Sequence, residues 1–145
     1  MPHIRVAIGA TLLALALVGA LVYAGVRTEP PPRTLGGKVT IVGTAHFRWE
    51  PGTCTGAGPF TDLTEGASVL VRDLDGTTLL TTRLGAGMPE KITRDSTRQT
   101  AAHCTFLLPT EAVPSRPAYR IQIGRRPPSQ VEGPAIAHLT LRFGA

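Results

Sequence analysis

The chain has 145 residues and a formal net charge of +5, and this length allows one ordinary domain. Residues 38–145 carry twelve basic and nine acidic residues, because three arginines and Glu29 precede them. The basic residues are scattered, with one adjacent pair at Arg125 and Arg126. Clustered basic stripes are typical of nucleic-acid binders, so we expect no nucleic-acid partner.

Residues 6–26 form a run of 21 residues without a charge. A helix of this length spans roughly 32 Å, which matches the hydrocarbon core of a bilayer. Tyr23 lies near the outer end of the run, where tyrosines of the membrane interface occur. We therefore expect residues 1–26 to be an N-terminal transmembrane anchor that contacts the lipid bilayer through residues 6–26. The alternative is a signal peptide that is cleaved near Ala24, which would give a secreted protein.

A linker is expected at residues 27–37, before an extracytoplasmic β-sandwich domain at residues 38–145. The three prolines at 30–32 favour an extended, stiff spacer, and Gly36 and Gly37 predict a flexible joint. Such a segment would hold the domain a short distance from the membrane.

The hydrophobic period changes to two after Lys38. Residues 39–49 alternate as one half-buried strand, with Trp49 on its apolar face. Residues 68–72 and 77–84 predict a hairpin, because Asp73–Gly76 is a turn sequence with glycine at its last position.

Residues 85–100 are mostly polar, and we expect them to be irregular. Three further alternating strands are expected at 103–108, 119–123 and 139–143. Short strands with turn-rich connections predict an all-β fold. The expected architecture is an Ig-like or transthyretin-like antiparallel β-sandwich, preceded by one N-terminal transmembrane helix.

The chain has two cysteines, Cys54 and Cys104, and two cysteines in an exported chain normally pair. We expect a structural disulfide that closes a loop of about 51 residues and stabilises the domain by roughly 4 kcal/mol. A redox-active pair would need the Cys-x-x-Cys spacing, which is absent. The predicted disulfide also supports a single-pass topology with the C-terminal domain outside the cell membrane, since the charges that flank residues 6–26 orient them poorly.

A longer pattern joins these features. It runs through Cys54, Gly66–Asp73, Asp75–Gly76, Leu79 or Leu80, Leu84–Gly85, Cys104–Phe106, Val113–Pro114 and Tyr119–Gly124. In this order it resembles a group of uncharacterised actinobacterial exported or membrane-anchored proteins with a transthyretin-like (carboxypeptidase-regulatory-like) β-sandwich. The resemblance covers about residues 54–124 and implies fold and location, but no activity.

Three histidines are candidate metal ligands. His46, His103 and His138 fall on the outward phase of the expected strands, and three on one sheet could bind zinc. No carboxylate or cysteine lies at ligand spacing from them, so surface histidines are expected, with no metal and no cofactor.

Catalytic motifs are not evident. No serine lies in Gly-x-Ser-x-Gly or Ser-x-x-Lys. Glu50, Asp62 and Glu65 lie near Cys54 in the sequence, but a chain this small offers little room for a substrate cleft. We therefore expect no catalytic residues and no enzyme activity.

The expected function is that of a membrane-tethered, non-enzymatic structural or protein-interaction module of the cell envelope, with an envelope protein as a possible partner. The alternative is a module that binds an envelope carbohydrate or small ligand. Trp49 is the possible ligand contact, with loops 50–66 or 85–101 around it, although its phase favours packing in the core.

Overall fold

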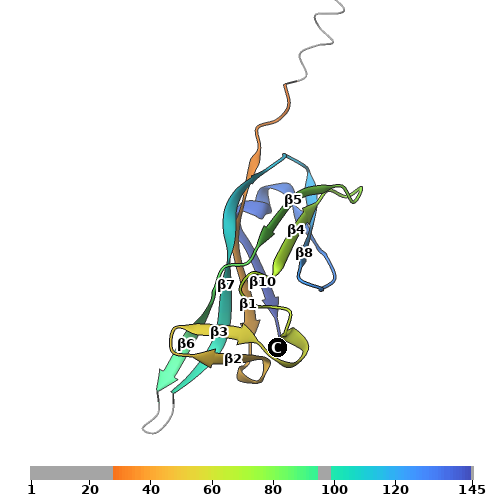
Figure 1. The fold of residues 1–145 in the computed structure, drawn as a ribbon. Helices are drawn as coiled ribbons and strands as arrows, with labels where there is room; N and C mark the ends of the chain where they lie inside the picture. The colour runs from red at the N-terminus through yellow and green to blue at the C-terminus, as the bar shows by residue number, and fades with distance from the viewer. Residues whose placement is uncertain (1–27, 95–98, 145) are drawn as a thin grey trace, which may run out of the picture. The chain divides into compact units, whose positions relative to one another are not determined.

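The computed structural model describes residues 28–94 and 99–144. The strands lie in one compact unit, Pro31–Ala145, and form two sheets (Figure 1). Sheet A has the order β10-β1-β7-β6-β3-β2, and sheet B has the order β5-β4-β8-β9. The strands are β1 (Arg33–Val42), β2 (Phe47–Glu50), β3 (Thr53–Gly56), β4 (Ser68–Arg72), β5 (Thr78–Arg83), β6 (Gly87–Arg94), β7 (Gln99–Val113), β8 (Ala118–Ile123), β9 (Ser129–Glu132) and β10 (Leu139–Phe143). Three short 3-10 helices connect them: η1 (Thr44–His46), η2 (Gly58–Phe60) and η3 (Gly133–His138).

One continuous core lies between the two sheets. It is built from alternate residues of the central strands, as expected when one face of each sheet is buried. The largest fully buried side chains are Leu35, Val39 and Ile41 of β1, Val69 and Val71 of β4, Phe106 and Val113 of β7, Tyr119 and Ile121 of β8, and Leu63 and Ile136 of the connections. The predicted all-β fold with two packed sheets is confirmed.

Five predicted strands are confirmed. Residues 68–72 and 78–83 form the antiparallel β4–β5 hairpin. The Asp73 carboxylate accepts hydrogen bonds from the backbone N–H groups of Asp75 (3.0 Å) and Thr77 (2.9 Å), and Gly76 takes a positive φ of 91°. This Asx geometry explains why the predicted turn forms there. The strands expected at 103–108, 119–123 and 139–143 lie in β7, β8 and β10.

The start of the domain differs from the prediction. β1 begins at Arg33, so residues 33–37 belong to sheet A and not to the linker. Leu35 is fully buried there, and a Cβ on Gly37 would lie 2.1 Å from the carbonyl oxygen of Leu139. Gly37 therefore permits close packing of β1 against β10, and Gly36 lies against the carbonyl oxygen of Ala137 in η3, so the two glycines do not form a flexible joint. β1 and β10 also pair in parallel, whereas the predicted sandwich was purely antiparallel.

Residues 39–49 do not form one strand, which corrects the prediction. β1 ends at Val42, and Gly43 takes a φ of 95°, which turns the chain into η1 before β2 begins. Only glycine adopts this conformation without strain, and the alternation of apolar residues does not report it.

Residues 85–100 are not irregular either, because β6 occupies Gly87–Arg94 and pairs with β7. Its side chains are mostly exposed, so hydrogen bonds to β7 define this strand rather than burial of an apolar face. β3 and β9, of four residues each, were also not predicted.

The Tyr119 hydroxyl fixes the turn between β7 and β8. The ring is fully buried, and the hydroxyl donates to the carbonyl oxygen of Pro114 (2.9 Å) and accepts from the backbone N–H of Arg116 (3.0 Å). The substitution Tyr119→Phe removes both bonds, and we expect it to lower the free energy of unfolding by roughly 1–3 kcal/mol. Urea unfolding followed by circular dichroism measures this loss, and unchanged stability would show that water replaces the hydroxyl.

The predicted anchor at residues 6–26 lies outside the described residues. Among the residues that the structure does describe, no helix is long and apolar enough to cross a bilayer.

Candidate functional site

The predicted disulfide is confirmed. Cys54 of β3 and Cys104 of β7 are bonded, with their Cα atoms 5.9 Å apart. Both strands belong to sheet A, and β6 lies between them in the strand order. Gly87 of β6 pairs with Cys54 on one side and with Phe106 on the other, so the absence of a side chain at Gly87 lets the flanking strands approach. The bond therefore fixes the β2–β3 hairpin to the centre of sheet A.

A shallow hollow of about 260 Å³ lies on the β2–β3 hairpin. It is lined by Arg48, Trp49, Glu50, Thr53, Cys54 and Thr55. Trp49 is half-buried and packs against the core, while its remaining surface faces the hollow. The hollow combines an aromatic surface with a cation, a carboxylate and two hydroxyl groups, which is the chemistry that polar ligands such as sugars use. Its volume lies just below the usual range of ligand pockets.

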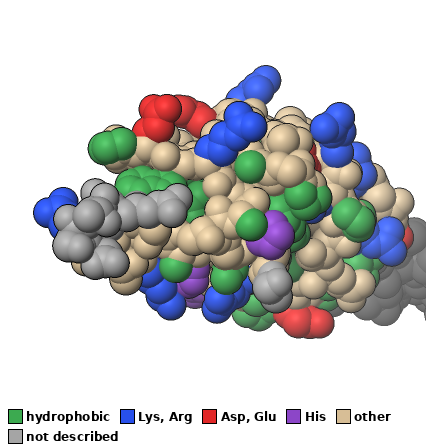
Figure 2. Space-filling view, turned by 90° about the horizontal axis from the view of Figure 1, so that it is seen from below, with side chains coloured by type: hydrophobic (Ala, Val, Ile, Leu, Met, Phe, Trp, Pro, Cys, Tyr) green, Lys and Arg blue, Asp and Glu red, His purple; other side chains and the backbone are tan. Residues whose placement is uncertain are grey.

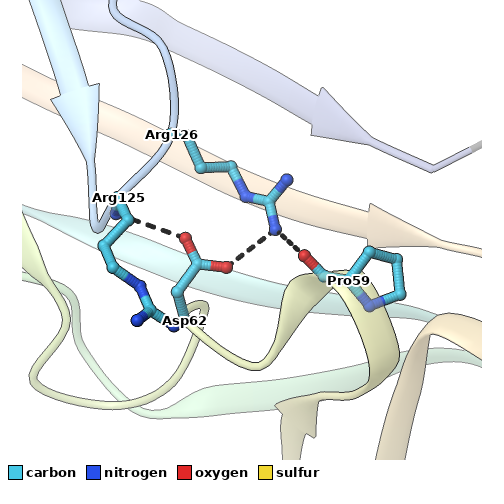
Figure 3. Close-up of polar contacts among 4 residues, drawn as sticks. All are labelled: Pro59, Asp62, Arg125 and Arg126. Carbon is cyan, nitrogen blue, oxygen red and sulfur yellow. Dashed lines mark hydrogen bonds and ion pairs between the residues drawn. The ribbon is translucent and has the colours of Figure 1, made fainter.

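Asp62 and Arg126 form an ion pair (Figure 3). Arg126 donates to the Asp62 carboxylate (2.7 Å) and to the carbonyl oxygen of Pro59, and the backbone N–H of Arg125 donates to the same carboxylate (3.3 Å). The guanidinium also lies over the ring of Phe60, 4.4 Å from its centroid. This arrangement joins the η2 loop to the β8–β9 turn, so Asp62 and Arg126 have a structural role.

The other two carboxylates singled out in the sequence, Glu50 and Glu65, are both exposed, Glu50 at the end of β2 and Glu65 in the loop before β4. Asp62 is engaged by Arg126, so its carboxylate is not free to act with them.

The three histidines do not share one set of strands, which corrects the expected placement. His46 lies in η1 and packs edge-on against Phe60 (5.1 Å between ring centroids), and His138 ends η3. Only His103 lies in a strand, on β7 opposite Glu90. Within residues 28–94 and 99–144, no group of three or more His, Cys, Asp or Glu side chains is arranged to hold a metal ion.

His103 should make stability depend on pH. Desolvation lowers its pKa below the ordinary value of 6.5; Lys91, Arg142 and Lys38 lower it further, and Glu90 opposes them. The unfolded chain therefore binds a proton more readily, and stability falls as the pH drops below about 6.5. We expect a small loss of stability between pH 7.5 and 5 that is reduced in His103→Gln. Paired unfolding curves at the two pH values test this, and an identical loss in the variant would contradict it.

Exposed large hydrophobic side chains concentrate on the β6–β7 hairpin. Among the described residues four are exposed, and three of them lie here: Met88 (41%), Ile92 (45%) and Leu107 (51%). Figure 2 views the molecule from the end that carries β2 and β3, and hydrophobic side chains reach the surface there beside acidic and basic ones. Sequence reasoning missed this hairpin because β6 was expected to be irregular.

Hydrogen bonds between polar side chains link β1, β7 and β6 beneath these exposed residues. Thr40 and Thr105 are buried, their hydroxyl oxygens are 3.2 Å apart, and Thr105 donates to the carboxylate of Glu90 (3.0 Å). These bonds satisfy polar groups that would otherwise be costly to bury, and they couple β1, β7 and β6. The exposed side chains of Met88 and Leu107 are thus presented on a rigid sheet.

No protein-family model, curated protein or solved structure matches this chain.

Proposed function

We propose that the chain is a membrane-tethered, extracytoplasmic and non-enzymatic module that binds another protein of the cell envelope. The observation that carries the proposal is the concentration of Met88, Ile92 and Leu107 on the β6–β7 hairpin. Exposed apolar side chains bordered by polar ones are typical of protein-interaction surfaces. The partner expected from this chemistry is a protein with an apolar patch of its own.

The apolar run at residues 6–26 and the disulfide support the proposed location. Because β1 begins at Arg33, the spacer of the proposed tether shortens to residues 27–32. Two packed sheets with a disulfide are also compatible with the Ig-like or transthyretin-like class and with the exported actinobacterial group that the sequence resembles.

Site-specific photocrosslinking in intact membranes tests the proposal. A photoreactive residue at Leu107 in the full chain should give one discrete adduct in the membrane fraction. The same probe at Glu65, an exposed loop position, is the matched control and should give none. Equal patterns at the two positions, or recovery of the chain in the cytosol, would contradict the proposal.

The hollow beside Trp49 favours a second candidate function, the binding of a small envelope ligand such as a neutral sugar. Trp49 is the only tryptophan, so its fluorescence reports directly on this site. Saturable quenching by a neutral oligosaccharide, weakened by Glu50→Gln, would support this function. An emission spectrum that stays constant through the titration would exclude it for that sugar.

A further inference from the structure

The outer face of sheet B carries two arginines side by side. Neighbouring residues in β4 and β8 are buried in the core, so Arg72 and Arg120 alternate away from it. The register of β4 and β8 places these two residues directly opposite one another. Residues in this relation have Cβ atoms about 4.5–5.5 Å apart, and like charges there destabilise a sheet. The opposed charges of Arg72 and Arg120 therefore lower the stability of the sheet.

Among the residues that the structure describes, the one ion pair joins Arg126 to Asp62. Neither Arg72 nor Arg120 is therefore paired with a carboxylate of this part of the chain. Asp73 follows Arg72 directly, but its carboxylate accepts from the backbone N–H groups of Asp75 and Thr77 in the turn. Among the paired residues of β8 and β9, the acidic position is Glu132, which is opposite Ala118. Arg72 instead donates to the amide oxygen of Gln122 at a long distance, 3.4 Å. Most of the hydrogen-bond donors of the two guanidinium groups thus remain available.

A third arginine extends the cationic face. Arg83 of β5 lies opposite Ser68 at the other end of β4 and donates to the carbonyl oxygen of Gly66 (3.1 Å). Ser68 and Arg72 are four residues apart, which is about 13 Å along a strand. A small anion can engage the Arg72 and Arg120 pair alone, whereas a linear chain of anions can reach Arg83 as well.

Most of the other side chains of this face are polar, apart from the half-buried Leu70 of β4 and the buried Ala118 of β8. Gln122 and Gln130 flank the pair, and amide groups both donate to and accept from hydroxyl groups. None of the exposed large hydrophobic side chains among the described residues lies in the strands of sheet B. An interfacial membrane surface or a protein-interface core would need such side chains.

We propose that the outer face of sheet B, centred on Arg72 and Arg120, binds an acidic polysaccharide that carries carboxylate or phosphate groups. Guanidinium groups bind both anions through paired hydrogen bonds. This surface is separate from the β6–β7 hairpin and from the Trp49 hollow, and it adds a ligand to the proposed protein-interaction role.

The test is a titration of the full chain, in mild detergent, with polygalacturonate as the carboxylate probe and poly(glycerol phosphate) as the phosphate probe. We expect at least one polymer to bind more tightly than the neutral polymer dextran, with an affinity that falls as salt rises. The double variant Arg72→Gln/Arg120→Gln should weaken binding at least about tenfold. Arg94→Gln removes an exposed charge from β6 and should leave the affinity within about twofold.

Two readouts separate this inference from misfolding and from the protein-interaction proposal. The double variant should unfold at the same or a higher denaturant concentration, because it relieves the opposed charges, and it should keep the Leu107 photoadduct. Equal losses in the double variant and Arg94→Gln would overturn the inference. Failure of both acidic polymers to bind, or tighter binding to anionic vesicles or an oligonucleotide, would overturn it too.

Discussion

Reduction of the Cys54–Cys104 disulfide should lower the free energy of unfolding by about 4 kcal/mol. The two cysteines are 50 residues apart, and opening a loop of this length returns a large conformational entropy to the unfolded chain. A domain of this size has a net stability of about 5–15 kcal/mol, so this loss is a large fraction of the total. Urea unfolding with and without reductant, followed by the fluorescence of Trp49, measures the difference.

The control is the double variant Cys54→Ser/Cys104→Ser. Its unfolding curve should be insensitive to reductant and should lie close to that of the reduced native chain. A loss of less than about 1 kcal/mol on reduction would mean that core packing alone fixes the β2–β3 hairpin. That outcome would also remove the stability argument for export into an oxidising compartment.

The strands that the sequence predicted correctly are those with one buried face. In 119–123, for example, Tyr119, Ile121 and Ile123 are buried and alternate with Arg120 and Gln122, so the period of two reports the structure directly. β6 has no such pattern, because most of its side chains are exposed. Hydrogen bonds to β7 hold this strand in the sheet. A strand that is held by backbone hydrogen bonds and buries no apolar face leaves no alternation of apolar residues in the sequence.

The turn at Gly43 and the close approach at Gly37 were missed for a related reason. A glycine in a polar or apolar run does not show whether it supplies a positive φ, a flexible joint or room for another strand. Here Gly43 turns the chain and Gly37 lies against Leu139. Only the position of β10, almost a whole domain later in the chain, determines the role of Gly37.

The candidate binding surfaces could be predicted even less well than the strands, because they are formed by strand pairing. Arg72 and Arg120 both stood on the outward phase of correctly predicted strands, but their direct opposition follows from the β4–β8 register. Likewise, the structural role of Asp62 follows from its ion pair with Arg126, which the β8–β9 turn places beside it. The identity of these side chains was visible in the sequence, while their partners were set by topology.

A single added methyl group at Gly87 is expected to have a large effect on stability. A Cβ at this position would lie 2.2 Å from the carbonyl oxygen of Cys54 and 2.7 Å from Cε1 of Phe106. The first contact is with backbone and cannot be relieved by a side-chain rotation, so β3 must move away from β6. We expect Gly87→Ala to lower the free energy of unfolding by about 3 kcal/mol, the upper part of the range for overpacked cores.

Because Cys54 is the residue that must move, Gly87→Ala should also hinder the disulfide, and a fraction of the purified protein should carry two free thiols. Thiol titration under denaturing conditions measures that fraction, and urea unfolding measures the stability. Gly85→Ala is the matched control two residues earlier, where the added Cβ would meet only the Leu107 carbonyl oxygen, at 3.4 Å. It should keep the disulfide intact and change stability by less than about 1 kcal/mol. If the two variants behaved alike, the close packing of β3, β6 and β7 around Gly87 could not be what positions the cysteines.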